Sequence, residues 1–153
     1  MDPMSVSVAL VGFAASLTTL AAPVVDSSRT LYDIRRRLKD APEDITRFLR
    51  LVMEFECLLS VVQEQIRDHQ VEYAASGMER LFEMAVKYMQ NDMEGFKDTM
   101  QRLEGLLSAS SSRRRRLELR IRHVLQQERV GDYQRLIASH IGTLTLLMEI
   151  LSR

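Results

Sequence analysis

The sequence has no tryptophan, a single cysteine, and only six glycines and three prolines over 153 residues. One cysteine cannot form an internal disulfide or a cysteine-based zinc site within one chain, which fits a reducing cytosol. The low number of glycines and prolines leaves few places for sharp turns, and the sequence also lacks the period-two alternation of β-strands. These absences together predict a mostly helical protein.

Net charge is also absent, because 21 basic residues balance 21 acidic ones. No overall field therefore draws the chain to nucleic acid or acidic lipid, and any electrostatic role depends on local clusters. The length fits one domain with its own hydrophobic core. We therefore predict a single helical domain over residues 1–153, located in the cytoplasm.

The segment from Pro3 to Val25 carries no charge. It lacks the basic leader of a secretion signal. As a helix it would be about 34 Å long at ~1.5 Å per residue, long enough for a hydrocarbon core of ~30 Å. Several serines and threonines, together with Pro23, make it weaker than a constitutive transmembrane helix. Membrane contact and burial in a core both stay open at this point.

Apolar residues recur at alternating steps of three and four, the pattern of helices packed side by side. The stripes are Leu10, Phe13, Leu17, Leu20, Val24, Ser27, Leu31, Ile34 and Leu38; Ile45, Phe48, Val52, Phe55, Leu59, Val62 and Ile66; Phe82, Ala85, Met89, Met93, Phe96, Met100, Leu103 and Leu107; Leu117, Ile121, Val124 and Leu125; and Val130, Tyr133, Ile137, Ile141, Leu144, Met148 and Leu151. Breaks are expected at "DAPED" (40–44), at "SASSS" (108–112) and within "VGDY" (130–133). The pattern predicts an all-α fold, an antiparallel bundle of four to five long amphipathic helices.

Chemically active residues form no recognisable constellation. His69, His123 and His140 lack the i, i+4 spacing of a helical metal site, so surface or boundary positions are expected for them. Cys57 lies among apolar neighbours, and a buried, inert thiol is expected there. No phosphate loop or nucleophile motif is present. The chain is therefore predicted not to be an enzyme, with no metal and no cofactor.

Two arginine clusters are the strongest local charges. Their members are Arg35, Arg36 and Arg37, followed by Lys39, and Arg113, Arg114, Arg115 and Arg116. Guanidinium groups match phosphate oxygens, so anionic lipid headgroups and nucleic-acid backbones are both suitable partners. No aromatic residues interleave with the clusters, which argues against nucleic acid. Contact with anionic lipid or with a protein partner is the favoured role, against the alternative of a solvated helix face.

The start "MDPMSVSVALVGFAASL" resembles the N-terminal domains of fungal NOD-like (STAND) receptors of the HeLo-like branch. Asp40, Ala41 and Pro42 match the turn between the first helices of that family, and "RHVLQQERVGDYQRLIASHIGTLTLLMEIL" is similar to its closing helices. The chain departs from the family at Met4, usually leucine, and at His123, often tryptophan. The resemblance covers nearly the whole chain and implies a bundle similar to those of plant immune receptors and necroptosis executioners.

That resemblance implies a cell-death domain of the heterokaryon-incompatibility or immune type, switched by oligomerisation and relocating from the cytoplasm to the plasma membrane. The residues expected to engage lipid lie in the first helix: Val6, Val8, Leu10, Val11, Phe13, Leu17 and Leu20. The expected partners are anionic membrane lipids, further copies of the chain, and like domains of a receptor or effector. On this expectation the chain is either a domain excised from a longer protein or a partner that lacks its own switch. The alternative is a non-lytic adaptor module that binds a like domain.

Overall fold

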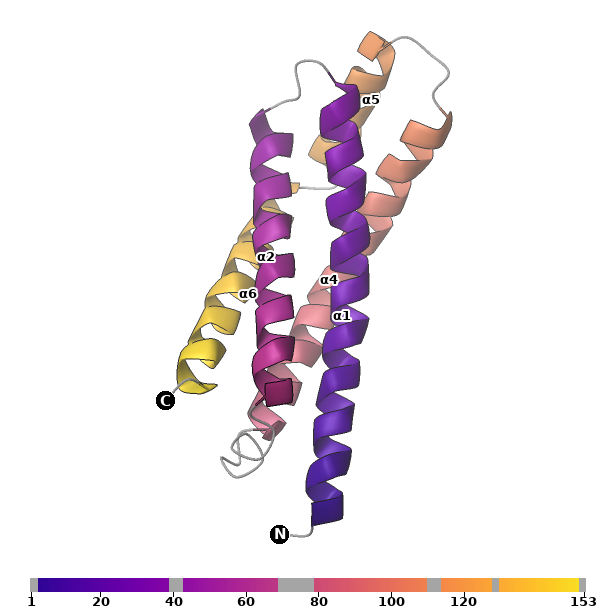
Figure 1. Ribbon diagram of the computed structural model, residues 1–153. Helices are drawn as coiled ribbons and strands as arrows, with labels where there is room; N and C mark the ends of the chain where they lie inside the picture. Colours follow the sequence, from indigo (N-terminus) through magenta and orange to yellow (C-terminus); the bar gives the residue numbers. More distant parts are fainter. Residues whose placement is uncertain (1–2, 39–42, 69–78, 110–113, 128–129, 152–153) are drawn as a thin grey trace.

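In the computed structural model, five helices make up the described part of the chain (Figure 1). Their bounds are α1 Pro3–Arg37, α2 Glu43–Asp68, α4 Glu79–Ala109, α5 Arg114–Gln127 and α6 Val130–Leu151. The structure describes residues 3–38, 43–68, 79–109, 114–127 and 130–151, and within them all side chains except those of residues 3–14, 44, 79, 109, 114 and 151. These ranges contain no strand, so the predicted all-α class is confirmed for them.

Helix α1 is continuous through Pro23, which has no N–H to donate to the carbonyl of Thr19. Leu20 and Val24, on either side of the proline, are fully buried, so packing holds the helix together where the ladder of hydrogen bonds is interrupted. Ser27, the one polar member of the predicted stripe, is also buried and donates a 2.6 Å hydrogen bond to the carbonyl of Pro23. The hydroxyl therefore fits the core without an unsatisfied polar group.

The core consists mainly of the predicted stripes. Every described stripe member on α1 and α2 is buried, and on α4 only Ala85 is partly exposed. Val86 of α4 and Leu147 of α6 are buried outside the predicted sets. Four buried phenylalanines supply the largest side chains, and the rings of Phe48 and Phe96 lie 5.3 Å apart between centroids. This regular burial along each stripe is typical of amphipathic helices that pack around one core.

Two of the predicted chain breaks overlap described helices, and residues 110–112 of the first lie outside the description. Helix α4 continues to Ala109, so Ser108, assigned to the loop "SASSS", is helical; the buried Leu107 beside it holds the last turn against the core. Helix α6 begins at Val130, so "VGDY" forms its first turn, and the buried side chain of Val130 anchors that turn. The Asp40–Pro42 turn lies outside the described residues.

Helices α1 and α4 are neighbours that run in the same direction. The side chain of Gln90 donates a 2.8 Å hydrogen bond to the carbonyl of Ser16 near one end of the pair. Arg37 donates a 2.9 Å hydrogen bond to the carbonyl of Leu107 near the other end. Residue numbers thus rise together along both helices, which defines a parallel pair.

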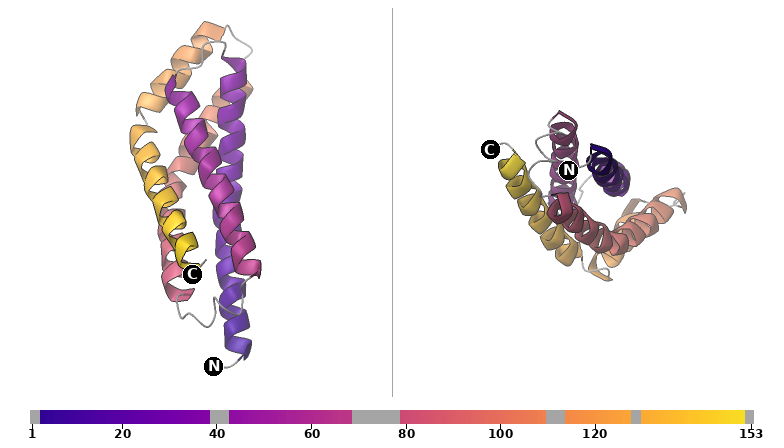
Figure 2. Two further views of the ribbon diagram at one scale, coloured as in Figure 1. Left: turned by 60° about the vertical axis from the view of Figure 1, so that its left-hand side comes forward. Right: turned by 90° about the horizontal axis from the view of Figure 1, so that it is seen from below.

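Helices α4 and α6 run in opposite directions, since His140 faces Asp92 and Tyr133 faces Phe96. Helix α2 packs on α1 and α6, while α5 packs on α4, so the long elements follow one another around the core in the order α1, α2, α6, α4 (Figure 2). In Figure 1 the chain rises along α1, descends along α2, rises along α4 and descends through α5 and α6. The long helices α1, α2, α4 and α6 therefore alternate in direction along the chain, while the neighbours α1 and α4, and likewise α2 and α6, are parallel.

The N-terminal part of α1 extends past the ends of the other helices in Figure 1 and in the left view of Figure 2. Helix α1 has 35 residues, which corresponds to a length of about 50 Å at a rise of about 1.5 Å per residue. Its first described core contact is Leu17. The opposite end of α1, with Arg35, Arg36 and Arg37, lies beside the end of α4.

Candidate functional site

The first candidate surface is the uncharged N-terminal half of α1. Leu17 and Leu20, two of the residues expected to engage lipid, are each only 1% exposed and belong to the core. Val6, Val8, Leu10, Val11 and Phe13 lie in the part of α1 whose side chains the structure does not describe. The structure therefore divides the expected lipid-contacting set between the core and the projecting end of α1.

The outward side of α1 changes character along its length. Ala15, Thr18, Thr19 and Ala22 are exposed and uncharged, and from Asp26 onward every exposed position of α1 except Tyr32 carries charge. The first half of the helix is therefore neutral both on its core face and on its solvent face. No helix among the described residues is sufficiently long and apolar to cross a bilayer.

The second candidate surface is basic, and we call it the basic end. It comprises Arg35, Arg36 and Arg37 at the end of α1 and Arg115 and Arg116 in the first turn of α5, all exposed. Figure 1 shows the end of α1 and the start of α5 at the same end of the molecule. The structure thus brings together two clusters separated by more than seventy residues in the sequence. The side chain of Arg114 and the whole of Arg113 lie outside the description.

Some exposed arginines within the described ranges form ion pairs and others do not. Among the described residues, Arg35, Arg36, Arg115 and Arg116 have no carboxylate within ion-pair distance. Arg122, on the same helix as the last two, lies 3.0 Å from Glu118. Guanidinium groups without an internal partner keep their full capacity for phosphate oxygens.

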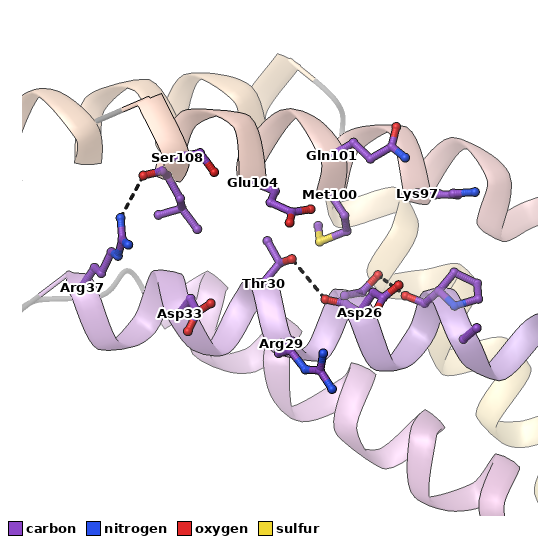
Figure 3. Close-up of a pocket in the computed structure, with 14 residues that line it drawn as sticks. Asp26, Arg29, Thr30, Asp33, Arg37, Lys97, Met100, Gln101, Glu104 and Ser108 are labelled. Atoms are coloured by element: carbon purple, nitrogen blue, oxygen red, sulfur yellow. Dashed lines mark hydrogen bonds between the residues drawn. The ribbon is translucent and has the colours of Figure 1, made fainter. Parts of the chain in front are cut away.

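A cleft of about 490 Å³ lies between α1 and α4 (Figure 3). Asp26, Asp33 and Glu104 line it together with Arg29, Arg37 and Lys97, and the side chains of Glu104 and Met100 point from α4 towards α1. Arg37 closes one end by its hydrogen bond to the last turn of α4, where a cation also compensates the helix dipole. Three charges of each sign favour no single class of charged ligand, so the cleft supports no functional assignment.

The expectation for the histidines is wrong for His140. This residue is only 7% exposed, stacks on Phe55 at 6.1 Å between ring centroids, and places Nε2 3.1 Å from Oδ2 of Asp92. Burial lowers the pKa of His140 below its usual value, and the carboxylate of Asp92 offsets part of that effect. Its position three residues after Ile137 and four before Leu144 was the available signal, because both belong to the apolar stripe. His123 is exposed, and His69 lies outside the described residues.

The expectation for Cys57 is also wrong, because its side chain is exposed. It lies two residues from both Phe55 and Leu59, which are buried, and two residues on a helix correspond to a rotation of about 200°. The thiol therefore faces solvent although its neighbours in sequence are apolar. In the part of the chain that is described, no three ionisable side chains are grouped so as to hold a metal ion.

Comparison with known proteins found no matching family model, no matching curated protein and no matching solved structure.

Proposed function

We propose that this protein is a HeLo-like, membrane-acting cell-death domain in which the N-terminal part of α1 engages lipid. The observation that carries the proposal is the position of the uncharged segment, which projects beyond the other helices and has a neutral outward side up to Ala22. A helix end without charged side chains enters the interface of a bilayer at little electrostatic cost. The five helices act as one bundle that supports this end.

The basic end supplies attraction to anionic lipid on this proposal. Juxtamembrane arginines contribute about 1 kcal/mol each near an anionic surface. In the described conformation the basic end and the projecting end of α1 are separated by the length of that helix, about 50 Å at about 1.5 Å per residue. A bundle standing on one end cannot bring both to the same membrane. Recruitment by the basic end and insertion of α1 are therefore two steps, and oligomerisation connects them as the domain relocates from the cytoplasm to the plasma membrane.

Leakage of dye from anionic vesicles tests the role of α1. Phe13→Asp changes a residue that precedes the first described core contact, whereas Leu17→Glu would place a charge in the core and unfold the bundle. We expect Phe13→Asp to fold normally by circular dichroism and to lose leakage. Leu146→Asp, which replaces an exposed residue of α6 (57% exposed), is the matched control and should leak like the parent. Full leakage by a folded Phe13→Asp variant contradicts the proposal.

Vesicle cosedimentation tests the basic end separately. Replacing Arg35, Arg36, Arg115 and Arg116 by glutamine should weaken binding to anionic vesicles by up to about a thousandfold, from about 1 kcal/mol per arginine. The control removes four exposed charges elsewhere, at Arg67, Arg80, Lys87 and Arg135. Equal loss of binding in both variants would mean that net charge, rather than the basic end, attracts the protein to lipid.

A non-lytic adaptor that binds a like domain is the second candidate function. The exposed apolar residues of α4 favour it: Leu81, Met84 and Tyr88 are 54%, 50% and 65% exposed and follow one another at helical spacing. Exposed apolar patches mark protein-binding surfaces. On this alternative the protein self-associates without lipid, the substitution Tyr88→Ser weakens the association, and vesicles of any composition leave the protein in solution.

A further inference from the structure

His140 is the one described histidine in the core, and three helices meet at its ring. The imidazole belongs to α6, its face stacks on Phe55 of α2, and its Nε2 atom approaches Asp92 of α4. The Nε2 atom is buried, and the 3.1 Å approach to Oδ2 lacks the alignment of a hydrogen bond. A buried nitrogen beside a carboxylate, without a formed hydrogen bond, is a group whose protonation state changes local packing.

We propose that His140 is a pH-sensitive packing contact: when its imidazole takes up a proton, the packing of α6 against α2 and α4 is weakened. The neutral ring fits an apolar site against Phe55, whereas an imidazolium in that site loses hydration. Among the described residues, Asp92 is the charged group that lies against the ring, and its side chain is 41% exposed, so water weakens its attraction for the new charge. On α2 the facing group is the uncharged Phe55, and on α6 the charged residues nearest in sequence are Arg135 on the N-terminal side and Glu149 on the C-terminal side.

The sign of the effect follows from proton linkage. The pKa of His140 is lowered in the folded state, mainly by burial, so the unfolded chain binds more protons below the ordinary histidine range. Its contribution to stability is therefore complete above pH ~6.5, the usual pKa of an unfolded histidine, and decreases as the pH falls towards the pKa of the folded state. A single proton changes the unfolding equilibrium by at most about tenfold per pH unit.

The experiment is urea denaturation of the full chain between pH 5 and 8, combined with amide hydrogen exchange of α6 at both ends of this range. His140→Phe removes the titrating group and keeps an aromatic ring; His140→Gln serves if the first variant does not fold. We expect the parent protein to lose stability and α6 protection on acidification more than the His140 variant does. Subtracting the variant's curve removes the contribution of carboxylates common to both proteins. His123→Gln, at an exposed position on α5, should retain the parent's pH dependence.

Asp92→Asn provides the second arm, with an effect in the opposite direction. Without the carboxylate the imidazolium loses the counter-charge that faces it, so acid should destabilise this variant more than the parent. The proposal is overturned if the His140 variants keep the full pH dependence of the parent, or if Asp92→Asn becomes less sensitive to acid. These measurements need no membrane, so their outcome is independent of the proposed function.

Discussion

Phe96 is the residue at which a single truncation should reveal most about the core. Its side chain is fully buried on α4, 5.3 Å from the ring of Phe48 on α2 and 5.6 Å from that of Tyr133 on α6, measured between centroids. Truncating a buried phenylalanine to alanine costs about 3–5 kcal/mol, and aromatic pairs contribute roughly 0.5–1.5 kcal/mol each beyond their buried area. Because the measured cost of truncation already includes such ring contacts, we expect Phe96→Ala to lie in the upper half of that range, at about 4–5 kcal/mol.

A loss of this size is a large part of the total stability of a domain, which is about 5–15 kcal/mol. At about 2–4 °C per kcal/mol for a chain of this length, the melting temperature should fall by roughly 8–20 °C. Because the chain contains no tryptophan, urea denaturation is best followed by far-ultraviolet circular dichroism. Tyr88→Ala is the matched control: it truncates an aromatic residue on the same helix that is 65% exposed, and should cost about 0.5 kcal/mol or less. Equal losses in the two variants would refute the assignment of Phe96 to the centre of the core.

Two further substitutions test contacts that the sequence did not predict. Arg37→Ala should lose about 1 kcal/mol by urea denaturation, because it removes the hydrogen bond to the carbonyl of Leu107 and a cation near the end of α4, whereas Arg36→Ala should be close to neutral; equal effects would contradict that contact. Cys57 should react with a thiol reagent in the native protein at nearly the rate found in urea, because its side chain is exposed; modification only after unfolding would contradict its placement on the surface.

The spacing of apolar residues was sufficient to predict the helices and most of the core. A helix repeats every 3.6 residues, so alternating steps of three and four identify the face that must be buried, whatever the partner. This is why Ser27 could be assigned to the stripe of α1 despite its polarity. The expectation for Cys57 failed because it relied on the apolar neighbours in sequence rather than on the position of the residue around the helix.

Helix boundaries depended on contacts that periodicity does not include. Serine and glycine are moderate or poor helix formers, so local propensity predicts loops at "SASSS" and "VGDY". In the folded protein Leu107 and Val130 are buried, and their packing keeps the adjoining turns helical. Tertiary contacts thus outweighed local propensity at both positions.

The sequence alone determined the helical class, the apolar faces of the helices and the places where charge is concentrated, since these follow from local spacing and residue chemistry. Only the tertiary structure decided that α1 and α4 are parallel neighbours, that His140 is buried between three helices, and that Arg35 and Arg115 share one end of the molecule. The physical reason is that an apolar stripe packs equally well against several partners and in either direction. The choice among them depends on how all the helices fill one core together.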